Sequence, residues 1–137
     1  EELLGKVHWA TVKSMRRATE KVYRCYGCDV SRLLDVCRQS IYFDTLDDLA
    51  ACLDVLTADP DVCLRRVVNK LRLSYDAEGT LGYRDVLVNL SVGTELARRL
   101  CVDTHVCEVQ LVLVGFAAIR SDAGHARYVA WRNHRAA

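Results

Sequence analysis

Apolar and polar residues alternate along this chain with two periods, one typical of helices and one typical of strands. Between Glu2 and about Tyr26, apolar side chains recur every three or four positions, which predicts an amphipathic helix with Gly27 as its C-cap. Thr45 is a good N-cap for a second long helix, because its hydroxyl can accept a hydrogen bond from the first turn. The expected helices cover residues 2–26, 30–35, 45–56 and 116–134.

A period of two residues predicts four strands. The last of them shows the alternation most clearly, because Cys107, Val109 and Leu111 fall on one face while Glu108 and Gln110 fall on the other. The expected strands cover residues 36–43, 62–71, 82–92 and 104–113, and the segment 93–103 fits either a short helix or a loop. This order of elements predicts an α+β domain, in which a small mixed β-sheet of about four to five strands is flanked by helices.

Length and composition limit the classes of protein to consider. Of the 137 residues, 51% are hydrophobic, so we expect residues 1–137 to form a single domain with its own core. The longest apolar run, 111–119, is half of the ~20 residues that a membrane span needs, and we expect no membrane partner. The acidic start has no secretory signal and no initiator methionine, so we expect part of a longer protein or a processed chain.

The charge of the chain is nearly balanced but unevenly spread. A formal net charge of +1 gives no general argument for nucleic acid, and we expect no specific nucleic-acid partner. Both ends of the chain are basic, whereas residues 44–61 hold six Asp and no basic residue. If the two ends meet in the fold, they form a positive surface that suits phosphate, and the alternative is a solvated basic rim.

Seven cysteines are many for this length. An odd number without a signal peptide predicts free thiols in a reducing compartment, the cytoplasm. Cys25 and Cys28 form a CxxC pair, but a zinc site needs about four ligands and the chain has no second pair. A redox CxxC normally starts a helix, whereas this one follows a predicted helix, so both functions are disfavoured.

Glu108 is the most informative residue, because it lies inside an apolar strand. A carboxylate there is costly unless it is paired, hydrogen-bonded or bound to a metal. The alternative is that this face of the sheet is open to solvent. Gln110 on the same face indicates either a shared purpose or shared solvent.

Basic residues follow one side of the first predicted helix. Lys13, Arg17, Lys21 and Arg24 recur every three or four positions and form one stripe. Beside a sheet that carries Glu108, such a stripe can hold Mg²⁺ and a polyphosphate together, with carboxylates for the ion and cations for the phosphates. It can equally be the solvated side of an amphipathic helix.

The start of the third predicted strand carries polar side chains at alternate positions. Tyr83, Asp85 and Asn89 share one face of that strand. An exposed Tyr at a strand start can stack a nucleotide base, although such a Tyr is more often half-buried packing. The chain has no GxGxxG, GxxxxGK[ST], GxSxG or HExxH motif, so dinucleotide-binding, P-loop, serine-hydrolase and zincin functions have no motif support.

Taken in order, these elements resemble the synthetase domain of the RelA/SpoT family. Members of that family have a nucleotidyltransferase-like fold and transfer pyrophosphate from ATP to the 3′-hydroxyl of GDP or GTP. The resemblance runs from about residue 12 to about residue 110. It rests on four motifs, namely Val12-Lys13-Ser14 followed by Lys21, Leu34-Asp35-Val36-Cys37-Arg38, Gly82-Tyr83, and Glu108-Val109-Gln110-Leu111.

The resemblance implies a role for particular residues of this chain. Asp35 and Glu108 are the implied catalytic pair and the implied ligands of Mg²⁺. Tyr83 is implied to stack on guanine. The full set of implied nucleotide-binding residues is Lys13, Lys21, Arg38, Lys70, Arg72, Tyr83 and Gln110.

The chain also departs from the family pattern. Leu87 stands where the family has His, Val112-Leu113 where it has Arg-Thr, and Thr11 where it has Arg. The first hypothesis is therefore a divergent enzyme that transfers pyrophosphate from Mg-ATP to a nucleotide hydroxyl, with ATP and a guanine nucleotide as partners. The second is a catalytically inactive RelA/SpoT-like domain that serves as a structural or protein-interaction module in a larger assembly. A third is nucleotide transfer to another acceptor.

Overall fold

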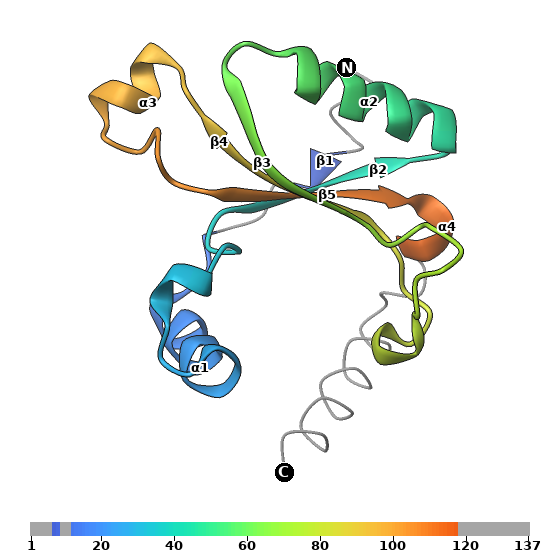
Figure 1. Ribbon diagram of the computed structural model, residues 1–137, viewed down its shortest axis with the longest axis horizontal. Coiled ribbons are helices and arrows are strands. Elements are labelled where there is room, and N and C mark those ends of the chain that lie inside the picture. The colour runs from blue at the N-terminus through green and yellow to red at the C-terminus, as the bar shows by residue number, and fades with distance from the viewer. Residues whose placement is uncertain (1–6, 9–11, 118–137) are drawn as a thin grey trace.

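The strands of this chain form one five-stranded mixed sheet in the order β1-β2-β5-β4-β3 (Figure 1). The computed structural model describes residues 7–8 and 12–117. Strands β2 and β5 run parallel, and the other neighbouring pairs run antiparallel. The expected small mixed sheet flanked by helices is confirmed. The strands are β1 (Val7–His8), β2 (Arg38–Phe43), β3 (Val62–Asn69), β4 (Val86–Val92) and β5 (Cys107–Leu113).

The helices lie on both faces of this sheet. Helix α2 crosses one face, and α1 lies on the opposite side (Figure 1). Short 3₁₀ helices follow α1 and β3. The helices are α1 (Met15–Tyr26), α2 (Leu46–Ala58), α3 (Glu95–Arg99), α4 (Val114–Ala117) and the 3₁₀ helices Val30–Arg32 and Glu78–Thr80. Within the described residues, none of the helices is long and apolar enough to cross a membrane.

Local sequence signals set the ends of the two longest helices. The side chain of Ser14 accepts a hydrogen bond from the backbone N–H of Arg17, so α1 begins at Met15. Gly27 ends α1 with φ 55°, a conformation that glycine adopts without steric cost. Thr45 caps α2 through the N–H of Asp48, as expected.

The core lies between α2 and the face of the sheet that turns toward it. Leu111 and Val88 are fully buried on the two central strands, and Leu49 of α2 packs against them. Partly buried apolar residues from β2, β3 and the remaining turns of α2 surround this cluster. The alternation predicted for 104–113 is confirmed, because Glu108 and Gln110 lie on the opposite face, together with Arg38 and Ser40 of β2.

The expected starts of three elements are wrong. The helix expected from residue 2 corresponds to α1, which begins at Met15, and Val7–His8 is instead an edge strand that pairs antiparallel with β2. Residues 2–6 and 9–11 of that expectation lie outside the described residues. Pairing along the sheet outweighs the helical spacing there. The strands expected from residues 82 and 104 begin at Val86 and Cys107, because turns occupy the preceding residues. Most of the expected closing helix, and the basic end at 120–137, lie outside the described residues.

Replacing Leu111 with Ala tests the assigned core. The side chain is fully buried in the middle of the sheet, so we expect the free energy of unfolding to fall by about 2–5 kcal/mol. Urea unfolding followed by circular dichroism measures this. Leu73→Ala is the control, because Leu73 is fully exposed and its loss should change stability by less than about 0.5 kcal/mol. Equal effects of the two substitutions would contradict the assigned core.

Candidate functional site

A row of polar side chains crosses the face of the sheet that α2 leaves free. The strand register places Arg38 of β2 beside Glu108 of β5, Asn89 of β4 opposite Glu108, and Arg66 of β3 opposite Asn89. Residues aligned in this way share a face, and their side chains are neighbours. The row therefore surrounds Glu108 with an arginine on one side and an amide on the other.

Asp35 lies at the end of this row nearest α1 and is held by two lysines. Its Oδ2 accepts hydrogen bonds from the ammonium groups of Lys13 and Lys21, the latter at 2.8 Å. The backbone N–H of Lys13 also donates to the carbonyl of Val36 (3.0 Å), which fixes the start of α1 against the segment that leads into β2. Lys13 therefore precedes α1, and the expected stripe divides into two lysines that face Asp35 and two exposed residues, Arg17 and Arg24.

The charges around Asp35 shift its pKa. Burial by itself would raise the pKa of Asp35, but the hydrogen bonds from Lys13 and Lys21 outweigh burial and lower the pKa below its ordinary value. The pKa of Lys21 is raised, because its hydrogen bonds to Asp35 and Tyr26 outweigh the effect of burial. The other oxygen of Asp35, Oδ1, is buried and has no hydrogen-bond partner. A buried carboxylate oxygen in that state suits a hydrogen-bond donor or a cation.

Glu108 is about half-buried beside this group. Burial and the negative charge of Asp35 raise the pKa of Glu108 above its ordinary value, with a smaller contribution from Asp85. The positive charges of Arg38 and Lys21 offset only part of this rise. From the sequence, a functional role for Glu108 and a position on a solvent-exposed face of the sheet were equal alternatives. The structure brings Glu108 together with Asp35, Lys21 and Arg38.

Asn89 is a site residue that sequence reasoning did not select. Its side chain is 2% exposed, and its Nδ2 has no hydrogen-bond partner. It lies across the strand pair from Glu108. The signal was present, since the alternation of the strand places Asn89 on one face with Tyr83 and Asp85 inside an otherwise apolar segment.

A second polar network beside Glu108 joins β2 and β5 to the residue before β4 and the residue after β3. The hydroxyl of Ser40 donates to Oε1 of Gln110 (3.1 Å), and Nε2 of Gln110 donates to Oδ2 of Asp85 (3.3 Å). Oδ1 of Asp85 accepts from the ammonium group of Lys70 at 2.7 Å. Asp85 is fully buried and was not selected from the sequence. Lys70 therefore reaches the site with its charge already paired.

The expected nucleotide-binding residues Arg72 and Tyr83 lie in the loop between β3 and β4. Tyr83 is half-buried, and its backbone N–H donates to the carbonyl of Thr80 (3.1 Å). Arg72 is exposed. Tyr83 precedes β4, at the end of the sheet where Asp85 and Lys70 pair.

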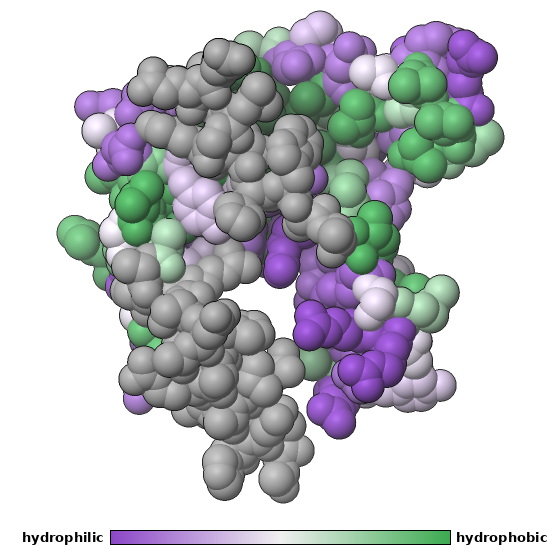
Figure 2. Space-filling model, turned by 180° about the vertical axis from the view of Figure 1, so that it is seen from behind, coloured by the Kyte–Doolittle hydropathy of each residue, from purple (hydrophilic) through white to green (hydrophobic). Residues whose placement is uncertain are grey.

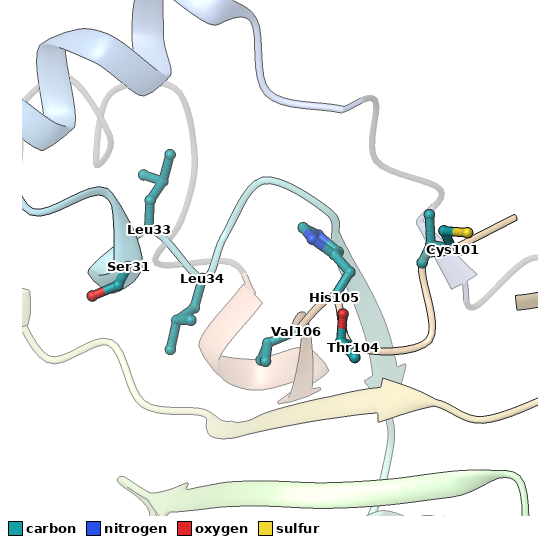
Figure 3. A pocket seen from close by; sticks show the side chains of 8 residues that line it. Ser31, Leu33, Leu34, Cys101, Thr104, His105 and Val106 are labelled. Carbon is teal, nitrogen blue, oxygen red and sulfur yellow. The ribbon is translucent and has the colours of Figure 1, made fainter. Parts of the chain in front are cut away.

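An open, largely apolar pocket of about 440 Å³ adjoins the charged group (Figure 3). Leu34 lines it directly before Asp35, and Val106 lines it two residues before Glu108. Figure 3 shows that the pocket lies between the segment after α1 and the loop that leads into β5. Figure 2 shows hydrophilic side chains gathered over α1, on the same side of the sheet.

The cysteines do not contribute a cluster of ligands to this site. All seven are free thiols, and Cys25 and Cys28 are exposed at the end of α1. Among residues 7–8 and 12–117, no group of three or more His, Cys, Asp or Glu side chains is arranged to hold a metal ion. A divalent ion bound here would therefore be coordinated by two protein carboxylates and by oxygens of water or of a bound phosphate group. This mode is typical of Mg²⁺ with nucleotide phosphates.

Replacing Asn89 with Leu tests whether its buried amide is kept at a cost to stability. An unpaired buried donor costs about 1–3 kcal/mol, so we expect Asn89→Leu to raise the free energy of unfolding by about 1 kcal/mol. Ser40→Ala is the matched control, because Ser40 is also buried on this face but is hydrogen-bonded, and its loss should destabilise the fold. A less stable Asn89→Leu variant would show that the amide has a partner in the free protein.

The lowered pKa of Asp35 predicts a pH-dependent contribution to stability. A carboxyl whose folded pKa lies below its unfolded value stabilises the fold above the unfolded pKa, and this contribution is lost as pH falls through the folded pKa. The loss of stability caused by Asp35→Asn should therefore be constant near neutral pH and shrink below about pH 4. Urea unfolding between about pH 3 and pH 7 measures it, with the exposed Asp54→Asn as control. A pH-independent difference would argue against the ion pairs.

No family model and no curated protein matches the sequence. Solved structures do match. Small alarmone synthetase 2 from Bacillus subtilis aligns with a TM-score of 0.67 and 20% identity, over 90% of this chain and 62% of that chain. Small alarmone synthetase 1 from the same organism, bound to its product pppGpp, aligns with a TM-score of 0.67 and 19% identity, over 95% of this chain and 68% of that chain.

A GTP pyrophosphokinase family protein from Streptococcus pneumoniae aligns with a TM-score of 0.63 and 18% identity, over 89% of this chain and 57% of that chain. The chain thus spans between 57% and 68% of the length of these three structures. At these identities the similarity concerns the fold. The chain has the α+β fold of the RelA/SpoT-like small alarmone synthetases.

Proposed function

We propose that this chain is a divergent nucleotide pyrophosphokinase, which transfers a pyrophosphoryl group from Mg-ATP to a hydroxyl of a guanine nucleotide. One observation carries the proposal. Asp35 lies between two lysines, keeps one buried oxygen unpaired, and is close enough to Glu108 to raise the pKa of that carboxyl. Two carboxylates and two lysines at one place suit a divalent cation with a polyphosphate.

The similar structures support the choice of ligand. Small alarmone synthetase 1 was solved with its product pppGpp and, separately, with AMPCPP. Both ligands are purine nucleotides with a polyphosphate chain. We therefore propose ATP as the donor and GDP or GTP as the acceptor for this chain.

The residues present fit a magnesium ion. Asp35 Oδ1 is a buried oxygen without a partner, and Asp35 and Glu108 repel one another electrostatically, so a cation would relieve both. Asp35 and Glu108 would hold Mg²⁺. When bound, the ion would supply positive charge to the phosphate oxygens during transfer.

The side chains of this chain then have distinct roles. Lys13 and Lys21 bind the phosphates of ATP, and Arg38 lies on the neighbouring strand beside Glu108 to add a third cation. The acceptor hydroxyl attacks the β-phosphorus of ATP, the bond from that phosphorus to the α–β bridging oxygen breaks, and AMP leaves. Glu108 accepts the proton of the hydroxyl as a general base. Tyr83 orients the acceptor by stacking on its base.

A second candidate function is a catalytically inactive module for protein partners. The paired charges favour it, because Asp35 engages both Lys13 and Lys21 while Asp85 engages Lys70. These ion pairs satisfy the charged groups without a nucleotide. The seven free thiols support a reducing compartment, such as the cytoplasm, for either function.

Glu108→Gln separates the two functions. We expect the wild-type protein with Mg²⁺ and ATP to transfer labelled pyrophosphate to GDP or GTP, and the variant to lose transfer because the carboxylate is gone. Glu95→Gln is the matched control, since Glu95 is exposed on α3. Thin-layer chromatography of the labelled product measures transfer. Full activity of Glu108→Gln would refute the assigned role of Glu108.

Thermal unfolding with nucleotides provides an independent measurement. A ligand at about 100 times its dissociation constant stabilises the folded state by ~2.7 kcal/mol, which gives a clear rise in the midpoint. We expect such a rise with ATP only when Mg²⁺ is present, and a smaller rise in Glu108→Gln. No rise with ATP, GDP or GTP would favour the inactive module, and affinity capture of protein partners would follow.

A further inference from the structure

We propose that Arg84 is a positioning residue that holds the loop between β3 and β4 in its nucleotide-binding shape before any nucleotide arrives. The loop comprises residues 70–85, and Tyr83 directly precedes Arg84 near its end. The inference rests on the proposed function in one respect, namely that Tyr83 contacts the acceptor. The clamp itself stands on the contacts of the free protein.

The guanidinium group of Arg84 ties three points of the loop together. One terminal nitrogen donates to the carbonyl oxygens of Lys70 and Arg72, each at 2.9 Å. The other donates to the carbonyl oxygen of Tyr75, also at 2.9 Å. The same group lies over the ring of Tyr75, 5.6 Å from its centroid. Three carbonyls of an irregular segment are thereby satisfied by one side chain.

The next residue fastens the loop to the sheet from the other side. Asp85 is fully buried, and its carboxylate binds the ammonium group of Lys70 at 2.7 Å. The backbone N–H of Lys70 donates to the carbonyl of Asp85 (3.0 Å). Because neighbouring side chains of an extended segment point in opposite directions, Arg84 and Asp85 hold the start of the loop at two faces.

The far end of the loop is ordered by its own bonds. The hydroxyl of Thr80 lies within hydrogen-bond distance of the carbonyl oxygens of Ala77 (3.1 Å) and Tyr83 (2.7 Å), and its single proton suits the shorter contact to Tyr83. Leu81 and Gly82 have φ values of 53° and 85°, which turn the chain back toward β4. The position of the Tyr83 backbone is therefore set by Thr80 inside a loop that Arg84 closes.

This arrangement has a consequence for binding. A loop that is ordered in the free protein does not lose conformational freedom when a ligand binds, so its affinity is higher than that of the same loop unclamped. Arginine suits the role because its planar group offers several donors in a fixed fork, whereas lysine has one ammonium group on a longer flexible stem. Arg84 thus acts on the acceptor through Tyr83.

Arg84→Met and Arg84→Lys test the clamp in the free protein by hydrogen–deuterium exchange. We expect the amides between Tyr75 and Tyr83 to exchange at least about tenfold faster in both variants, while those of β4 and β5 keep their rates. Arg99→Met is the control, because Arg99 lies exposed on α3. Unchanged exchange in the loop would overturn the clamp, whatever the function of the chain.

Steady-state kinetics test the effect on the acceptor. In Arg84→Met we expect the KM for GDP to rise about tenfold, while the KM for ATP and kcat at saturating GDP change less than about twofold. Thr80→Val loosens the same loop from its other end. It should likewise raise the KM for GDP with little change in kcat and in the KM for ATP, even if Arg84→Met fails to fold. Faster loop exchange with an unchanged KM for GDP would overturn the role of the clamp in binding. A wild-type protein without transfer would refute the proposed function and the acceptor role, whereas the exchange rates would still decide the clamp.

Discussion

The parallel pairing of β2 with β5 is the constraint on which the candidate site depends. These two strands lie about seventy residues apart in the chain, and their register sets Arg38 beside Glu108 and Ser40 beside Gln110. Asp35 lies three residues before the start of β2, so the same pairing brings Asp35 near Glu108 at one end of the sheet. An antiparallel arrangement would place Asp35 and Glu108 at opposite ends. The chemistry of the site therefore follows from strand direction as much as from residue type.

Charge balance is the second organising feature. Two lysines meet Asp35, one lysine meets Asp85, and Glu108 lies among both kinds of charge. Such pairing keeps buried charges from destabilising the fold, because an unpaired buried charge is far more costly than a paired one. Because these lysines already pair with carboxylates, a nucleotide can bind them only if its phosphates replace those ion pairs. Stability of the free protein and affinity for a polyphosphate are therefore opposed in this site.

One face of the sheet stabilises the fold, and the other carries the candidate site. The face toward α2 is apolar, and its buried residues Leu111 and Val88 pack with Leu49 of α2 into a cluster that supplies most of the hydrophobic stabilisation. The other face carries the polar rows and the unpaired amide nitrogen of Asn89. A fold that is stabilised on one face can tolerate unsatisfied groups on the other. The ordered loop after β3 extends the second face beyond the end of the strands.

The local pattern of the sequence predicts many features of this fold. The period of two residues predicts which side chains of β5 face the core, Thr45 and Gly27 predict helix ends, and the short motifs around Asp35, Tyr83 and Glu108 indicate the fold family. These signals succeed because they depend on neighbours within a few residues. The helix expected from residue 2 fails for the same reason, since the pairing of Val7–His8 with β2 is a contact that local spacing does not contain.

Fold class and chemically important residue types were thus determined by the sequence alone, whereas their partners were decided by the tertiary structure. Only the folded chain shows that both lysines meet Asp35, that Asp85 pairs with Lys70, and that Nδ2 of Asn89 has no hydrogen-bond partner. Only the fold shows Arg84 bound to three carbonyls of one loop. Periodicity reports on which face a side chain lies, but ion pairing and hydrogen bonding depend on distances across strands that are remote in sequence.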